Sequence, residues 1–139
     1  MTSDDLSDKV NSDVQRAEYI CDYFRATSSN IEKTPEIAIM FTVDELNSKN
    51  SRGIKLCLGD YIDNIVEETP ENKYKIIVDM KNVRGNVDSE GYSALLVLNT
   101  LSITNFEKKI RVINCNYIVE RGIVISGLDD KFEVEYNKN

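Results

Sequence analysis

The stretch from Tyr74 to Gly91 reads YKIIVDMKNVRGNVDSEG, and it decides our interpretation of this 139-residue chain. Its first part, Tyr74–Met80, is nearly continuously apolar, which is typical of a strand in a sheet covered by helices. After a short turn, Asp88-Ser89-Glu90-Gly91 opens a predicted helix that runs to about Asn105. A buried strand followed directly by a helix indicates an α/β unit.

Two strands and one helix are predicted before this stretch. The strands are Glu18–Arg25, rich in aromatic residues, and Glu36–Val43, rich in Ile, Met, Phe and Val. Thr27-Ser28-Ser29-Asn30 is typical of a turn, so we expect the two strands to pair as a hairpin. From Ser51 to about Glu68, apolar residues recur at three- and four-residue steps, which predicts an amphipathic helix. Those residues are Ile54, Leu58, Tyr61, Ile62 and Ile65.

A strand, a helix and a further strand are predicted after it. Ile110–Asn114 is a buried strand, and Asn116 is an N-cap for a helix that Gly127 ends. Lys131–Tyr136 alternates apolar and charged residues, as an edge strand does. The order strand-strand-helix-strand-helix-strand-helix-strand predicts an α/β fold with a four- to five-stranded mixed sheet, mostly parallel in its later half.

The polar first residues suggest where the domain begins. We expect a flexible N-terminal segment over residues 1–16 and a single domain over 17–139. A loose helix over Leu6–Val14 is the alternative for the first segment.

Composition argues against several functional classes. The net charge of -7 disfavours binding to nucleic acid or to anionic lipid. The chain has no histidine, so Ser-His-Asp and Cys-His catalysis and the commonest metal ligand are absent. Its three cysteines form no Cys-x-x-Cys pair, and the acidic start does not resemble a targeting signal. We expect a cytoplasmic protein with no cofactor, no metal and no membrane-inserted segment.

Two motifs, in this order, resemble the STAS family (sulfate transporter and anti-sigma-factor antagonist). The first is the loop Asp88-Ser89-Glu90-Gly91, and the second is Ser126–Val134, which reads SGLDDKFEV. In that family an Asp-Ser-Ser-Gly loop starts a helix and Gly-Leu-Asp-Asp-x-Phe-Glu closes the domain. The resemblance covers about Ala17 to Glu135 and is strongest from Tyr74 onward.

The resemblance implies a bacterial regulatory module rather than an enzyme. Such a domain binds a serine kinase or anti-sigma-like factor when unphosphorylated and releases it when phosphorylated, and a phosphatase is a further expected partner. Glu90 stands at the usual phosphoserine position, with roughly one negative charge in place of nearly two. The expected partner-binding residues are Asp88, Ser89, Glu90, Gly91 and Tyr92, and Ser89 is the candidate phosphorylation site.

Plainer interpretations of the same residues stay open. Asp88 or Ser89 could simply cap the helix, with Glu90 favourable in its first turn and Gly91 needed for close packing. Lys81 and Arg84 flank the loop and could pair with its acids. In function, the alternatives are an accessory subunit of a membrane transporter ATPase, a scaffold subunit of a stress-signalling assembly that oligomerises, and, least supported, an enzyme or nucleotide-binding protein.

Overall fold

A computed structural model describes residues 16–31 and 34–136 and has an α/β fold. The expected flexible segment and its alternative helix lie outside these residues, apart from Arg16, which begins the first strand. Three helices and six strands follow one another in the described chain. They are β1 (Arg16–Ile20), β2 (Phe24–Ile31), β3 (Thr34–Phe41), α2 (Ser51–Glu68), β4 (Lys75–Asp79), α3 (Ser89–Phe106), β5 (Arg111–Ile113), α4 (Tyr117–Ile125) and β6 (Glu133–Val134).

The six strands form one mixed sheet whose order is the order of the sequence, β1-β2-β3-β4-β5-β6. The pairs β1–β2 and β2–β3 are antiparallel. The pairs β3–β4, β4–β5 and β5–β6 are parallel, which confirms the predicted parallel arrangement of the later half.

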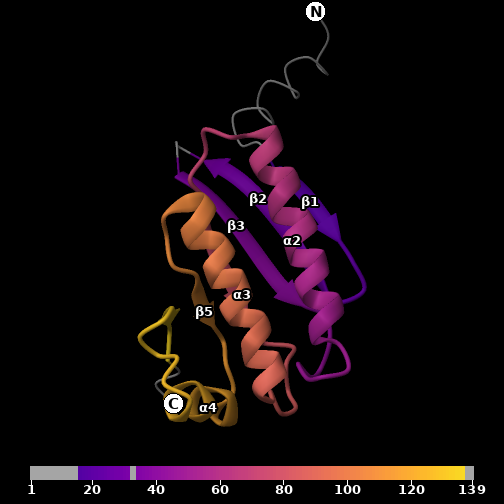
Figure 1. Cartoon of the computed structure of the whole chain (residues 1–139), viewed down its shortest axis with the longest axis vertical. Coiled ribbons are helices and arrows are strands. Elements are labelled where there is room, and N and C mark those ends of the chain that lie inside the picture. Colours follow the sequence, from indigo (N-terminus) through magenta and orange to yellow (C-terminus); the bar gives the residue numbers. More distant parts are fainter. Residues whose placement is uncertain (1–15, 32–33, 137–139) are drawn as a thin grey trace, which may run out of the picture.

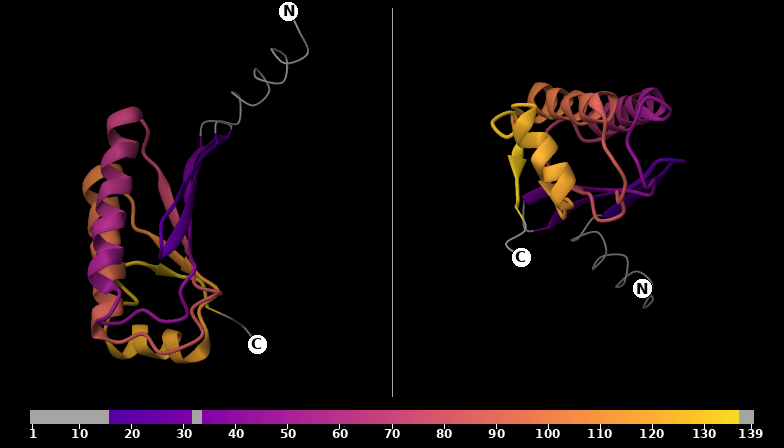
Figure 2. Two further views of the ribbon diagram at one scale, coloured as in Figure 1. Left: turned by 90° about the vertical axis from the view of Figure 1, so that its right-hand side faces the viewer. Right: turned by 90° about the horizontal axis from the view of Figure 1, so that it is seen from below.

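The helices are not distributed evenly over the sheet. Helices α2 and α3 lie side by side along one face, whereas α4 lies across the end of the molecule (Figures 1 and 2). The end that α4 occupies is the one where β3, β4 and β5 finish and the loops leading to the helices begin.

The core lies between the sheet and the pair α2 and α3. Alternate residues of the strands point into it, for example Ile37 and Ile39 of β3 and Ile76 and Val78 of β4, all fully buried. The five apolar residues expected on one face of α2 are all buried, which confirms that prediction. Full burial of a side chain of this size contributes about 1.5 to 3 kcal/mol to folding.

The predicted N-terminal strand Glu18–Arg25 is wrong, and so is the predicted turn at Thr27–Asn30. Residues 21–23 form a turn, closed by a hydrogen bond from the Cys21 N–H to the Phe24 carbonyl at 3.1 Å. Aromatic residues lie on both sides of this turn, and the turn contains no glycine or proline. The sequence pattern therefore resembles one continuous strand. The serines and threonine lie in the middle of β2, where β1 and β3 pair with them on either side. The sheet of the described residues therefore has six strands instead of four or five, and three of them precede α2.

The predicted ends of α4 are confirmed. The Asn116 side chain accepts a hydrogen bond from the Val119 N–H at 2.9 Å, so it is the N-cap. After the last turn, Gly127 has a φ of 71°, and the Leu128 N–H reaches back to the Ile123 carbonyl at 2.9 Å. This is the glycine-dependent Schellman ending, which turns the chain from α4 toward the short strand β6.

Candidate functional site

Asp88 is the N-cap of α3 and also connects two loops. One carboxylate oxygen accepts a hydrogen bond from the Gly91 N–H at 3.0 Å, and the other accepts one from the Ser48 N–H at 3.3 Å. Its own N–H donates to the Leu46 carbonyl at 3.2 Å. The capping role that we kept open for Asp88 is therefore confirmed, and the same side chain attaches the start of α3 to the loop that precedes α2.

Gly91 is buried where two backbones meet. A Cβ placed on Gly91 would collide with the Leu46 carbonyl oxygen and lie 2.7 Å from both the carbonyl carbon and the Cβ of Leu46. One residue earlier, the Glu90 carbonyl accepts a hydrogen bond from the Ser51 hydroxyl at 2.8 Å. Only a residue without a side chain allows this approach. The loop at residues 88–91 is therefore held in place by Leu46 and by Ser51 at the start of α2.

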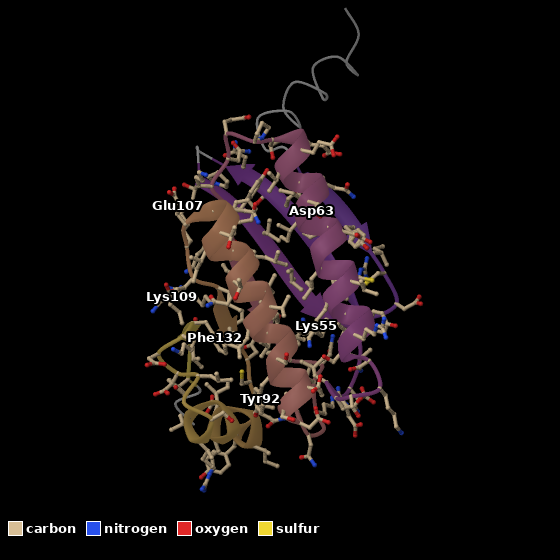
Figure 3. The ribbon with its side chains drawn as sticks, in the orientation of Figure 1. Lys55, Asp63, Tyr92, Glu107, Lys109 and Phe132 are labelled. Atoms are coloured by element: carbon tan, nitrogen blue, oxygen red, sulfur yellow. The ribbon has the colours of Figure 1, made fainter. Side chains whose placement is uncertain are left out.

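Asp88, Ser89 and Glu90 are the exposed part of the loop. The cation that lies beside them is Lys55 of α2, whose Nζ is 3.8 Å from a carboxylate oxygen of Glu90 (Figure 3). It takes the place that we had considered for Lys81 or Arg84. Because the Glu90 side chain is 54% exposed, this ion pair contributes less than about 1 kcal/mol.

Tyr92 does not belong to the exposed surface. Its side chain is only 8% exposed, and its hydroxyl donates to the Val119 carbonyl of α4 at 3.2 Å. Its aromatic ring leaves no room for a side chain at Gly122, where a Cβ would lie 2.8 Å from the ring carbon that carries the hydroxyl. Burial, with a smaller contribution from Cys115, raises the pKa of Tyr92 above 10.0. Tyr92 therefore joins α3 to α4, and we leave both Tyr92 and Gly91 out of the contact surface.

The sequence interpretation missed the residues that hold this loop, namely Leu46, Ser48, Ser51 and Lys55. They come from the loop before α2 and from its first turns, about forty residues away in the chain. The periodicity of α2 indicates its buried face, but it contains no signal for which loop the helix start will meet. An isolated parallel bridge between Leu46 and Val87 makes the contact between the two loops continuous.

The chemistry available at this site is that of exposed acids and a hydroxyl. In residues 16–31 and 34–136, no group of three or more Cys, Asp or Glu side chains is placed to hold a metal ion.

Cys115 is fully buried, and burial, with smaller contributions from Glu120 and Asp79, raises its pKa to about 12. Within the same part of the chain, none of the helices has the length and hydropathy needed to cross a membrane.

The comparisons with known proteins support the fold alone. No protein-family model matches the chain, and no curated protein matches it. It is similar to a solved structure described as the "NMR Structure of the protein TM1081", with 19% identity over 85% of this chain and 78% of that chain, and a TM-score of 0.56. A subunit in the Pseudomonas malonate decarboxylase MdcD-MdcE heterodimer has 9% identity over 81% of this chain and 52% of that chain. Its TM-score of 0.44 is too low to carry an argument.

Proposed function

We propose that this protein is a non-catalytic regulatory module of the STAS type, which docks a serine kinase or anti-sigma-like protein through Asp88, Ser89 and Glu90. In this proposal Glu90 occupies the position at which the family carries its phosphoserine. The observation that supports it most is that three consecutive polar residues are exposed on a backbone that buried contacts hold in one place.

Rigidity of this loop favours docking. Ordering a flexible loop on binding costs free energy, and a loop already held by its own protein avoids that cost. The hydrogen bonds of Asp88 and the close approach of Gly91 to Leu46 supply the restraint here. The exposed side chains can therefore meet a partner in a defined geometry.

The charges around the loop suit an anionic switch. Ser89 and Glu90 lie in the first turn of α3, where unpaired backbone N–H groups and the helix dipole favour negative charge. Lys55 lies beside the Glu90 carboxylate. A phosphate on Ser89 would thus be tolerated by the fold while nearly two negative charges are added to the docking surface.

A matched pair of charge-adding variants tests the docking surface. Wild-type protein, Ser89→Glu and Thr100→Glu are used as baits in native cell extract, and retained proteins are identified by mass spectrometry. Ser89 and Thr100 are both exposed hydroxyl residues on α3, about three turns apart. We expect a serine kinase or anti-sigma-like protein on the wild-type and Thr100→Glu baits, with clear loss on Ser89→Glu. Equal retention on all three baits would place the contact elsewhere.

The role of Glu90 is tested with the retained partner. If Glu90 acts as a fixed substitute for phosphoserine, Glu90→Ser should bind the kinase-like partner more tightly and become its substrate, which calorimetry and phosphopeptide mapping measure. Unchanged affinity and no phosphate on residue 90 would contradict this role. If a transporter ATPase is retained on every bait instead, the accessory-subunit function replaces our proposal.

A further inference from the structure

An open cleft of about 700 Å³ lies at the carboxyl ends of β4 and β5, where α4 begins. Helix α4, whose first two residues line the cleft, crosses the end of the molecule (Figure 2). This volume lies within the range of about 300 to 1,000 Å³ that small-molecule sites occupy. Residues 88–92 do not line it, so it is separate from the docking loop.

Two cations line the cleft. Lys81 and Arg84 both line it, both are exposed, and none of the ion pairs within residues 16–31 and 34–136 involves either of them. The nearby Asp79 carboxylate already accepts hydrogen bonds from the Lys81 N–H at 3.0 Å and from the Asn114 side chain at 3.1 Å. The two cationic side chains are thus available to an anion from outside.

Apolar side chains also line the cleft. Tyr117 and Ile118, at the start of α4, are 68% and 63% exposed, and the Arg121 guanidinium lies 5.7 Å from the centre of the Tyr117 ring. The cleft is also lined by Met80, Val83 and Cys115, each at most 1% exposed. A cleft lined by two cations and by an exposed aromatic and an exposed aliphatic side chain suits a molecule with an anionic end and a flat apolar body.

The amides that line the cleft make hydrogen bonds within the protein. Asn116 caps α4 through its oxygen and donates to the Val83 carbonyl at 3.1 Å through its nitrogen. The Asn114 nitrogen is held by Asp79. Lys81 and Arg84 add further N–H donors, so an anionic group in this cleft meets both positive charge and hydrogen-bond donors.

We propose that this cleft binds a small organic anion, with one carboxylate or phosphate group held by Lys81 and Arg84 and a flat apolar body lying against Tyr117 and Ile118.

The test uses 1-naphthyl phosphate, 1-naphthoate, 1-naphthol and inorganic phosphate as probes with nitrogen-15-labelled full-length protein. Amide chemical shifts are followed during each titration. We expect both naphthyl anions to shift the amides of residues 80–84 and 114–118 in a saturable manner, and their relative affinities to show whether phosphate or carboxylate is preferred. Naphthol and inorganic phosphate should each bind about tenfold more weakly, because each lacks one half of the recognised chemistry.

Variants locate the two halves of the site. The double variant Lys81→Ala/Arg84→Ala should weaken the binding of both naphthyl anions about tenfold and leave the binding of naphthol unchanged. The control Lys49→Ala/Arg52→Ala removes the same charges from exposed positions outside the cleft, and it should leave all affinities unchanged. Ile118→Ser should weaken both naphthyl anions and naphthol alike. Equal affinity for naphthol and the naphthyl anions, or shifts that lie outside the two segments, would overturn the proposal.

Discussion

Replacing Gly91 by alanine tests whether the approach between the start of α3 and the loop before α2 positions the docking loop. The new methyl group would collide with the Leu46 carbonyl oxygen and lie 2.7 Å from two further atoms of Leu46. Most of these atoms belong to backbone, and the backbone is itself held by the hydrogen bond between the Asp88 N–H and the Leu46 carbonyl. Leu46 therefore cannot move away from the new methyl group without shifting the loop.

The expected magnitude combines two opposing effects. Overpacking of this kind costs about 1 to 3 kcal/mol, while replacing a helical glycine by alanine gains up to about 1 kcal/mol. We expect Gly91→Ala to lower the free energy of unfolding by about 1 to 2 kcal/mol. Gly59 of α2 is the matched control, because a Cβ there would meet nothing within 4 Å. Gly59→Ala should raise the free energy of unfolding by about 0.5 to 1 kcal/mol.

Urea denaturation followed by circular dichroism measures both variants against the wild type. A thermal melt gives a second reading, at about 3 to 5 °C for each kcal/mol in a chain of this length. Gly91→Ala should also weaken the partner retained in the pull-down, because the shifted loop alters Ser89 and Glu90. If Gly91→Ala were as stable as the wild type while Gly59→Ala were stabilised, the contact with Leu46 would not restrain the loop and our reasoning would be refuted.

Three further predictions concern buried and charged groups away from the loop. Asn99 is buried, donates to the Lys131 carbonyl at 2.9 Å and accepts from the Ile110 N–H at 3.0 Å. In urea denaturation, Asn99→Ala should therefore destabilise the protein by about 2 to 4 kcal/mol. The control Thr100→Ala should cost less than about 0.5 kcal/mol. Cys115, with its pKa of about 12, should resist iodoacetamide at pH 8 in the folded protein while the partly exposed Cys21 is labelled, and equal labelling would show that the core opens readily. Lys75, and to a smaller degree Arg111, hold the pKa of the Glu133 carboxyl below its ordinary value of 4.5. The resulting stabilisation, under about 1 kcal/mol because Glu133 is largely exposed, is complete above that value and is lost as the pH falls through the lowered pKa. The wild type should therefore lose more stability than Glu133→Gln between pH 6 and pH 3, and parallel pH profiles would contradict the role of Lys75.

Sequence patterns predicted those parts of the fold that residues close together in the chain determine. The apolar run at Tyr74–Met80, the periodicity of α2 and the N-cap Asn116 each carry their structural meaning within a few residues. The turn at residues 21–23 does not, because Asp22 is its only turn-favouring residue and lies among apolar residues that are typical of a strand. The sequence therefore predicted the parallel half of the sheet far better than the N-terminal hairpin.

The candidate site also has some contacts that the sequence could predict and others that it could not. The capping role of Asp88 follows from its place before a helix and could be stated as an alternative in advance. The burial of Tyr92 also had a signal, since it lies three residues before Leu95 and six before Leu98, on the same face of α3. The contacts of Leu46 with Gly91 and of Lys55 with Glu90 had none, because they join segments that only the packing of α2 against α3 brings together.

The order of the strands has a consequence for how the chain folds. Each strand pairs with the strand that precedes it in the sequence, and none has to insert between two that are already paired. The antiparallel hairpins of β1, β2 and β3 require only short loops to close, and each later strand adds at the growing edge after one helix has formed. Assembly can therefore proceed in the order in which a ribosome releases the chain, with β6 completing the edge last.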